Sequence, residues 1–307
     1  MTRRYNSYTG YFRKLYGERL QKVVLDAGFT CPNRDGTKGT GGCTYCDNAA
    51  FHPSYSKAGK PLLQQIDEGI EFHRVRYRNA RHFLAYFQSF SNTYAPVEKL
   101  RELYGEVLSH PDVVGIVVGT RPDCVDERKL DLLEELAKEN IVIVEYGIES
   151  CRDETLRRIN RGHDFETARK AVTMTAQRGI SVGAHFILGL PGESREMMLE
   201  QCGAINSLPL TSVKFHQLQL VKGTRMAREY AEHPEDFTRF TLDEYLDFMC
   251  EMLARLRPDL YIERVAGEVP PRFVTETPWG LIRNNEILDM LGRRLEDKDI
   301  FQGQYLL

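Results

Sequence analysis

The chain has 307 residues, of which 42% are hydrophobic and 28% are charged. This composition is typical of a globular protein that buries a core, as two ordinary domains or one large α/β barrel. The formal net charge of −3 at pH 7 excludes the chain-wide basic excess of a general polyanion-binding protein.

No apolar run approaches the roughly 18 residues that cross a bilayer. The opening MTRRYNSYTGYF lacks the apolar stretch of a secretory signal. Seven scattered cysteines do not form a disulfide framework. We therefore expect a cytoplasmic protein that does not enter the membrane.

Two segments are locally basic. The first is residues 1–20, and the second is HRVRYRNARH at residues 73–82. Each is either ordinary solvated surface or a contact for nucleic acid, and the sequence leaves both interpretations open.

In chain order, apolar runs rich in β-branched residues alternate with amphipathic helical patterns. Six such runs predict strands, at residues 22–27, 82–87, 113–120, 141–150, 181–190 and 212–221. The helical patterns between them lie at residues 62–76, 97–108, 126–139, 153–160, 165–178 and 195–205. Apolar strands separated by helices predict a parallel sheet that helices cover.

Six consecutive βα units fit a barrel or a partial TIM-like (β/α)6 barrel better than a doubly wound sheet, although the pattern alone allows both. In either fold the chemistry belongs at the carboxyl ends of the strands. After residue 221 the pattern changes to a helix at 241–256, a candidate extra strand in LYIERVAGE and a last helix at 286–295. We expect a basic segment at 1–20, a core barrel at 21–225 and an α/β extension at 226–307 that packs on the barrel.

Three cysteines follow the first predicted strand in a glycine-rich loop. Cys31, Cys43 and Cys46 form the pattern C-x11-C-x2-C, and two residues between thiolates let both reach one metal ion from a tight turn. Three interpretations compete: a plain loop with unligated thiols, a structural zinc with His52 as fourth ligand, and an iron–sulfur cluster on three cysteines that leaves one iron open.

At this loop the sequence resembles the radical S-adenosylmethionine (SAM) superfamily, and GFTCPNRDGTKGTGGCTYC is similar to its long-spacer branch, the YhcC-like or YtqA-like proteins. The resemblance extends over nearly the whole chain, through GTRPDC, INRGHDFETARKAV, ILGLPGE and LVKGT. It is more distant to the elongator catalytic subunit and to oxygen-independent coproporphyrinogen oxidase. It implies a partial barrel, a 4Fe–4S cluster on Cys31, Cys43 and Cys46, SAM on the open iron, and an external electron donor of the flavodoxin or ferredoxin type.

The resemblance also implies SAM contacts near the cluster. Tyr45 occupies the place of an aromatic residue that packs on adenine; ordinary loop packing is the alternative. After the second strand, FQSFSNTY stands in the place of the segment that binds the SAM amino group. There Gln88, Ser89 and Ser91 offer neutral oxygen acceptors, or simply form a polar turn.

Three further candidates follow strands four and five. The resemblance places Glu149 on the ribose hydroxyls and Arg161, twelve residues later, on the SAM carboxylate, which suits the planar guanidinium. His185 stands where a relative has an acidic ribose contact, but a histidine on a buried strand is also commonly a satisfied core residue.

For several other residues the sequence leaves a functional and a structural interpretation open. Arg121 and Asp123 either face the site or cap the next helix, and Arg264, Glu268 and Trp279 either touch substrate or pack the core. Another four cysteines show no second cluster spacing and fit inert thiols better than a redox role: Cys124, Cys151, Cys202 and Cys250.

The resemblance implies reductive cleavage of SAM to a 5′-deoxyadenosyl radical, which abstracts hydrogen from a substrate. A tRNA wobble uridine is our candidate substrate, because the TRPD element is similar to a tRNA-modifying relative and because of the two basic segments. A small metabolite is the alternative, and fold analogy does not separate them. A zinc-stabilised nucleic-acid-binding protein and a barrel hydrolase also stay open, and the oligomeric state is not indicated.

Overall fold

The computed structural model describes residues 4–47, 50, 52–76 and 80–306. Parts of both basic segments, residues 1–3 and 77–79, therefore lie outside the described residues. One sheet organises the molecule, and it contains seven parallel strands in the order β1 to β7. Their bounds are β1 Gln21–Leu25, β2 Phe83–Phe87, β3 Val113–Thr120, β4 Ile141–Glu149, β5 Ser181–Leu188, β6 Ser212–Gln217 and β7 Tyr261–Arg264.

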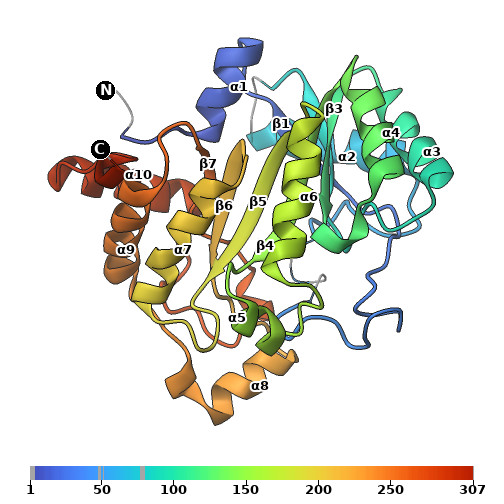
Figure 1. The fold of residues 1–307 in the computed structure, drawn as a ribbon. Helices are drawn as coiled ribbons and strands as arrows, with labels where there is room; N and C mark the ends of the chain where they lie inside the picture. Colours follow the sequence, from blue (N-terminus) through green and yellow to red (C-terminus); the bar gives the residue numbers. More distant parts are fainter. Residues whose placement is uncertain (1–3, 48–49, 51, 77–79, 307) are drawn as a thin grey trace.

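Helices connect consecutive strands, and five of those described cover the outer face of the sheet (Figure 1): α2 Leu62–Arg76, α3 Val97–Leu108, α4 Glu127–Ala137, α6 Phe165–Gln177 and α7 Arg195–Ser207. The shorter helices α5 Asp153–Arg158 and α8 Arg225–Glu232 lie at the carboxyl ends of the strands. Strand order follows chain order throughout, whereas a doubly wound sheet reverses direction at a switch point. The expected partial barrel is confirmed, and LYIERVAGE does form an extra strand, β7.

The strands are strongly apolar because most are buried on both faces. All five residues of β2 are buried, as parallel strands covered by helices require. Outward side chains such as Ala85 and Phe87 join the main core beneath the helices. Inward side chains such as Leu84 and Tyr86 join a second cluster inside the curve of the sheet. We call the space enclosed by this inner face the lumen.

A helix that the sequence analysis did not predict lies at the amino end of the lumen. This is α1, Tyr8–Tyr16, capped by the Ser7 side chain and ended by Gly17 at φ 75°. It buries Tyr8 and Phe12 against the inner cluster with Leu84, and lies beside the amino ends of the strands (Figure 1). The carboxyl ends point the other way, toward α5 and α8.

We call residues 226–306 the extension. Most of α8 lies in it, and α9 Leu242–Arg255 and α10 Asn284–Asp297 follow. Short 3-10 turns lie within it at Pro234–Asp236, Pro271–Phe273 and Gln304–Leu306, and another follows β3 at Pro122–Cys124. The backbone N–H of Gln302 donates to Arg4 (2.9 Å), and the Gln302 side chain accepts from the backbone of Asn6 (2.9 Å). Among the described residues, no helix is long and apolar enough to cross a bilayer.

Candidate functional site

The cysteine loop is compact because its backbone bonds back on itself. The N–H of Arg34 donates to Cys31 (2.8 Å), and the N–H of Gly42 donates to Asn33 (2.8 Å). Gly42 takes φ 76°, a conformation that glycine adopts without strain. The N–H of Cys46 donates to Cys43 (3.1 Å), which makes the tight turn expected of C-x2-C. The loop follows the carboxyl end of β1. Its internal hydrogen bonds keep the three cysteines close to that end.

Two cations lie beside the thiols. The Arg34 guanidinium donates to the Cys46 carbonyl (2.7 Å). Burial opposes its charge, but Cys46, Cys31 and Cys43 together raise the pKa of Arg34 above its usual value. The Cys43 thiol accepts from Arg161 Nη1 (3.5 Å) and lies 3.6 Å from Asn33 Nδ2. Burial raises the pKa of the Cys46 thiol, so in this structure the protonated form is favoured.

Within the described part of the chain, no three cysteine, histidine or carboxylate side chains are arranged to hold a metal ion, and all seven cysteines are free thiols. Whether the loop can hold an iron–sulfur cluster is therefore judged from the chemistry of its side chains. Thiolates are the ligands of iron–sulfur clusters, and cations beside them compensate the negative charge of such a group. The three thiols with Arg34 and Arg161 fit that requirement.

Arg161 joins the cysteine loop to the end of β4. Its Nη2 donates to the Gly147 carbonyl (2.5 Å) and lies 3.7 Å from Glu149 Oε1. The side chain is 7% exposed, and its Nε has no hydrogen-bond partner among the described residues. Burial opposes its charge, but Tyr45, Cys43 and Glu149 hold the pKa of Arg161 well above its usual value.

The backbone at the end of β4 is shaped for this contact. Glu149 takes φ 75°, a strained conformation for a non-glycine residue, and β4 shifts register there against β5. A methyl group on Gly147 would lie 2.5 Å from Glu149 Oε1 and 2.8 Å from Arg161 Nη2. Only glycine leaves room for this carboxylate–guanidinium pair.

Tyr45 lies beside the same group. Its ring packs on the apolar cluster that contains Leu156 and Ile159. Burial and the Glu149 carboxylate raise the pKa of Tyr45 well above its usual value, so the phenol stays protonated. The structure thus brings Cys43, Tyr45, Glu149 and Arg161 together, as the sequence analysis expected for residues from three separate segments.

The segment after β2 makes different contacts. Ser89 Oγ lies 2.6 Å from His52 Nε2, and His52 Nδ1 lies 3.5 Å from Asp26 Oδ2. Ser89 and Asp26 are buried. His52 therefore contacts a serine and an aspartate in this structure. Ser91 is fully buried, and its hydroxyl has no hydrogen-bond partner among the described residues.

His185 lies in the lumen, and on the sheet it pairs with Gly147, whose carbonyl accepts from Arg161. Its Nε2 is 2.9 Å from Glu145 Oε2, and its ring packs against that of His216 with centroids 5.5 Å apart. One ring nitrogen is therefore already engaged. This is the arrangement of a histidine within a buried polar network.

Sequence reasoning missed that network. Glu145 on β4 is 1% exposed and contacts Lys22 on β1 (2.5 Å) and Lys214 on β6 (2.6 Å). Glu263 on β7 contacts the same lysines, at 2.6 Å and 3.1 Å. Burial opposes ionisation, but the two lysines hold the pKa of Glu145 well below its usual value. The available signal was a charged residue inside each apolar strand, in KVVL, IVIVEYG and SVKFH.

Arg121 and Asp123, from GTRPDC, form a buried pair. Arg121 Nη2 lies 2.8 Å from Asp123 Oδ2, which also contacts Lys38 (2.5 Å). Arg121 Nη1 has no hydrogen-bond partner among the described residues. Gly162 follows Arg161 directly. Because it has no side chain, nothing at this position comes between Asn33 and the Arg121 guanidinium. Two buried guanidinium groups therefore flank the cysteine loop.

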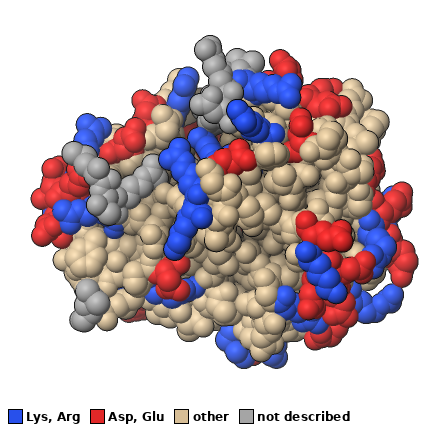
Figure 2. All heavy atoms as spheres, turned by 90° about the horizontal axis from the view of Figure 1, so that it is seen from above, with Lys and Arg blue, Asp and Glu red and all other residues tan. Residues whose placement is uncertain are grey.

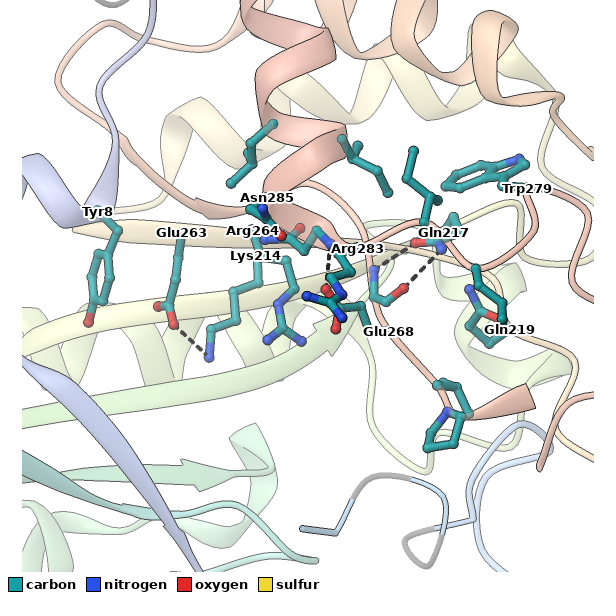
Figure 3. Close-up of a pocket in the computed structure, with 18 of the residues that line it drawn as sticks. Tyr8, Lys214, Gln217, Gln219, Glu263, Arg264, Glu268, Trp279, Arg283 and Asn285 are labelled. Atoms are coloured by element: carbon teal, nitrogen blue, oxygen red, sulfur yellow. Dashed lines mark hydrogen bonds and ion pairs between the residues drawn. The ribbon is translucent and has the colours of Figure 1, made fainter. Parts of the chain in front are cut away.

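A cavity of about 1610 Å³ lies next to the site, between α1, the inner face of the sheet and the C-terminal extension. We call it the basic cleft, and it is lined among others by Arg13, Lys22, Lys214, Arg264, Trp279 and Arg283. Figure 3 shows Tyr8, Lys214 and Glu263 at one end and Gln217, Gln219 and Trp279 at the other. Gln88 and His52 also line it, so the cleft reaches the carboxyl ends of the strands.

Comparisons with known proteins match the chain over most of its length. Residues 34–201 match a family model described as the Radical SAM superfamily, and residues 210–297 match a Radical_SAM C-terminal domain. Cys43 and Cys46 lie inside the first match, and Cys31 lies just before it.

The chain is 35% identical over 303 residues to uncharacterized protein YtqA of Bacillus subtilis, covering 99% of this chain and 93% of that protein. It is 29% identical over 190 residues to the tRNA uridine(34) acetyltransferase of Methanocaldococcus infernus, covering 61% of this chain and 34% of that protein. The solved structure of the M. infernus Elp3 with an N-terminal deletion superposes with a TM-score of 0.67 at 16% identity, over 92% of this chain and 64% of that chain.

Proposed function

The chain belongs to the radical SAM superfamily, and from this premise we propose that Cys31, Cys43 and Cys46 hold its 4Fe–4S cluster and that SAM binds beside Arg161. Enzymes of this family use the cluster and SAM as cofactors, and the chain is such an enzyme. When bound, the two supply a 5′-deoxyadenosyl radical that removes a hydrogen atom from the substrate.

One observation carries the proposal: the buried Arg161 side chain contacts the Cys43 thiol, the Gly147 carbonyl and the Glu149 carboxylate. Two N–H donors have no partner among the described residues, one on Arg161 Nε and one on Arg121 Nη1. They are available to an anionic group between the cysteine loop and β4. A carboxylate is the group that such donors bind most strongly. Arg161 would therefore orient the SAM carboxylate, and Glu149 would accept from ribose hydroxyls.

The protein's other contributions follow from its polar groups. Tyr45, a protonated phenol on an apolar cluster, offers a flat ring to the adenine. Gln88 and the unpaired hydroxyl of Ser91 offer acceptors for the amino group, and Ser89 positions His52 at the edge of the basic cleft. We do not extend the proposal to His185, because Glu145 engages its ring.

Anaerobic reconstitution tests the cofactor assignment. The reconstituted chain should be brown, contain acid-labile sulfide and release 5′-deoxyadenosine when SAM and dithionite are added. Cys43→Ala should lose both the colour and the release, whereas Cys250→Ala, which removes a buried thiol of the extension, should keep both. A colourless protein with one zinc and no sulfide would overturn the proposal.

The substrate that we propose is a tRNA wobble uridine. Support comes from the similarity to the tRNA uridine(34) acetyltransferase of M. infernus over 61% of this chain and from the basic cleft beside the site. Nucleosides of tRNA from cells with and without the gene test it. A changed wobble nucleoside that Cys43→Ala fails to restore is expected, and an unchanged profile would count against tRNA in favour of a small metabolite.

A further inference from the structure

The size of the basic cleft is the first indication of its ligand. Sites for small molecules usually occupy about 300–1,000 Å³, and the cleft encloses about 1610 Å³. A single metabolite would leave much of it empty. Its walls come from three separate parts of the chain, which are α1, the inner face of the sheet and the extension. A ligand that fills it must therefore be long.

The charge of the cleft favours an anionic ligand. Nine lysine or arginine side chains line it, against five aspartate or glutamate side chains, although the whole chain has a net charge of −3. Figure 2, seen from the end of the molecule where α1 lies, shows a group of basic side chains on that face, with acidic side chains around it. The lining of the cleft therefore carries more basic than acidic side chains.

Three of these arginines are free to bind a ligand. Arg13, Arg264 and Arg283 are exposed, and none of them forms an ion pair with a carboxylate of the described residues. In contrast, Lys22 and Lys214 are held by Glu145 and Glu263 deep in the lumen. The exposed arginines come from α1, the end of β7 and the residue before α10, and all three line the cleft. Figure 3 shows Arg264 and Arg283 close together beside Glu268.

Between these charges the cleft presents groups that suit unstacked bases. Gln219 and Asn285 point into it (Figure 3), and neither has a hydrogen-bond partner among the described residues. Phe72, on α2, also lines the cleft, and its side chain is 48% exposed. Amides read base edges and aromatic rings stack on bases, but both require a base that is not paired in a duplex.

We propose that the basic cleft binds the single-stranded loop of an RNA hairpin, with backbone phosphates on Arg13, Arg264 and Arg283. One base then turns toward Gln217 and Gln88, where the cleft meets the carboxyl ends of the strands. The inference rests on the proposed function for the choice of RNA. The binding itself requires neither the reductant nor SAM.

The test measures binding of a tRNA anticodon stem-loop to the reconstituted full-length chain by fluorescence anisotropy over a range of salt concentrations. Arg264→Ala/Arg283→Ala should weaken binding and lower the slope of log K against log salt by about 1.4, because each lost phosphate contact on a single strand contributes about 0.7. Arg128→Ala/Arg169→Ala removes two exposed arginines from the outer helices α4 and α6 and should leave both quantities unchanged.

A second variant separates base stacking from charge. Phe72→Ala should weaken loop binding about 5- to 100-fold without changing the salt slope, since base–aromatic stacking is not ionic. A fully paired duplex of the same sequence should bind less tightly than the hairpin. Equal binding by the cleft variant and the wild type, or by duplex and hairpin, would overturn the inference.

The experiments distinguish an error in the RNA inference from an error in the cofactor assignment. If the chain releases 5′-deoxyadenosine but does not bind the hairpin, the RNA inference is wrong and the radical SAM assignment stands. If it binds the hairpin through the arginines but carries no cluster, the cofactor assignment is wrong and the cleft is still an RNA site.

Discussion

At the scale of single residues, Arg161 joins the cysteine loop to the end of β4. It spans the Cys43 thiol, the Gly147 carbonyl and Glu149, and a lysine has neither the fork nor the width to replace it. Gly147 and Glu149 are adapted to it, one by lacking a side chain and the other by a strained backbone.

We expect Arg161→Ala to weaken SAM binding by the reconstituted chain about 10- to 100-fold, the loss typical of one hydrogen-bonded charge contact. Arg161→Lys should restore only part of this. Equilibrium dialysis with labelled SAM measures the change. Arg157→Ala, an exposed position on the neighbouring α5, is the control, and equal losses in both variants would speak against a direct role of Arg161.

The buried carboxylate of Asp123 makes the stability of the fold depend on pH. Burial alone would raise its pKa, but Arg121 and Lys38 lower it from 3.8 to about 2. Its ionised form therefore stabilises the fold above the unfolded pKa of 3.8, and this contribution is lost as pH falls through the folded pKa. Asp123→Asn should lower the free energy of unfolding by about 2 kcal/mol at pH 7, and the gap to wild type should narrow as pH falls below 4. Urea unfolding at several pH values tests this, and a gap independent of pH would contradict it.

The residue scale also shows what sequence could and could not predict. The resemblance to the radical SAM superfamily implied that Tyr45, Glu149 and Arg161 lie near Cys43, and the predicted strands that precede them agree with this. His52 was considered only as a metal ligand, because its contacts Ser89 and Asp26 come from the ends of two different strands. No local pattern reveals such a contact.

At the scale of elements, runs of β-branched residues and helical periodicity predicted the strands and outer helices to within a few residues. Two helices of the described residues, α1 and α8, were missed. The helix α1 was missed because YTGYFRKLY combines aromatic residues with a glycine and few strong helix formers. Its stability comes from burying Tyr8 and Phe12 against the sheet, and tertiary burial of this kind outweighs propensity.

Phe12→Ala should therefore lower the free energy of unfolding by about 3–5 kcal/mol, since Phe12 is 2% exposed. Leu15→Ala, on the same helix but 54% exposed, should change it by less than about 0.5 kcal/mol. Chemical unfolding of the two variants measures the difference. Similar effects would mean that α1 does not pack as described.

At the scale of the whole molecule, side chains link the two edges of an open sheet. In the sheet β1 and β7 are the two edge strands, paired with β2 and β6, and Ile262 of β7 also bridges to Ser7. Lys22 on β1 nevertheless lies 2.6 Å from Glu263 on β7. Glu145 and Lys214 extend this contact across the lumen. Sequence could not predict it, because the partners are 241 residues apart.

Lys22→Met should lower the free energy of unfolding by about 3–5 kcal/mol, because it leaves Glu145 and Glu263 with one cation fewer in a buried site. Adding Glu263→Gln should recover part of the loss, and the two single changes should not add. Urea unfolding of the four proteins gives the coupling energy. Simple additivity would show that the two residues do not interact.

The bonds between Gln302 and residues 4–6 have a consequence for the order in which the protein is made. Asn6 leaves the ribosome 296 residues before Gln302, which at usual rates of synthesis is roughly 15 to 60 s. For most of that interval β1 can pair with β2, but partners of residues 4–7, among them Pro258, Ile262 and Gln302, are not yet made. The segment before α1 is therefore held in place long after it is synthesised, and until then the apolar face of α1 depends on the nascent barrel alone.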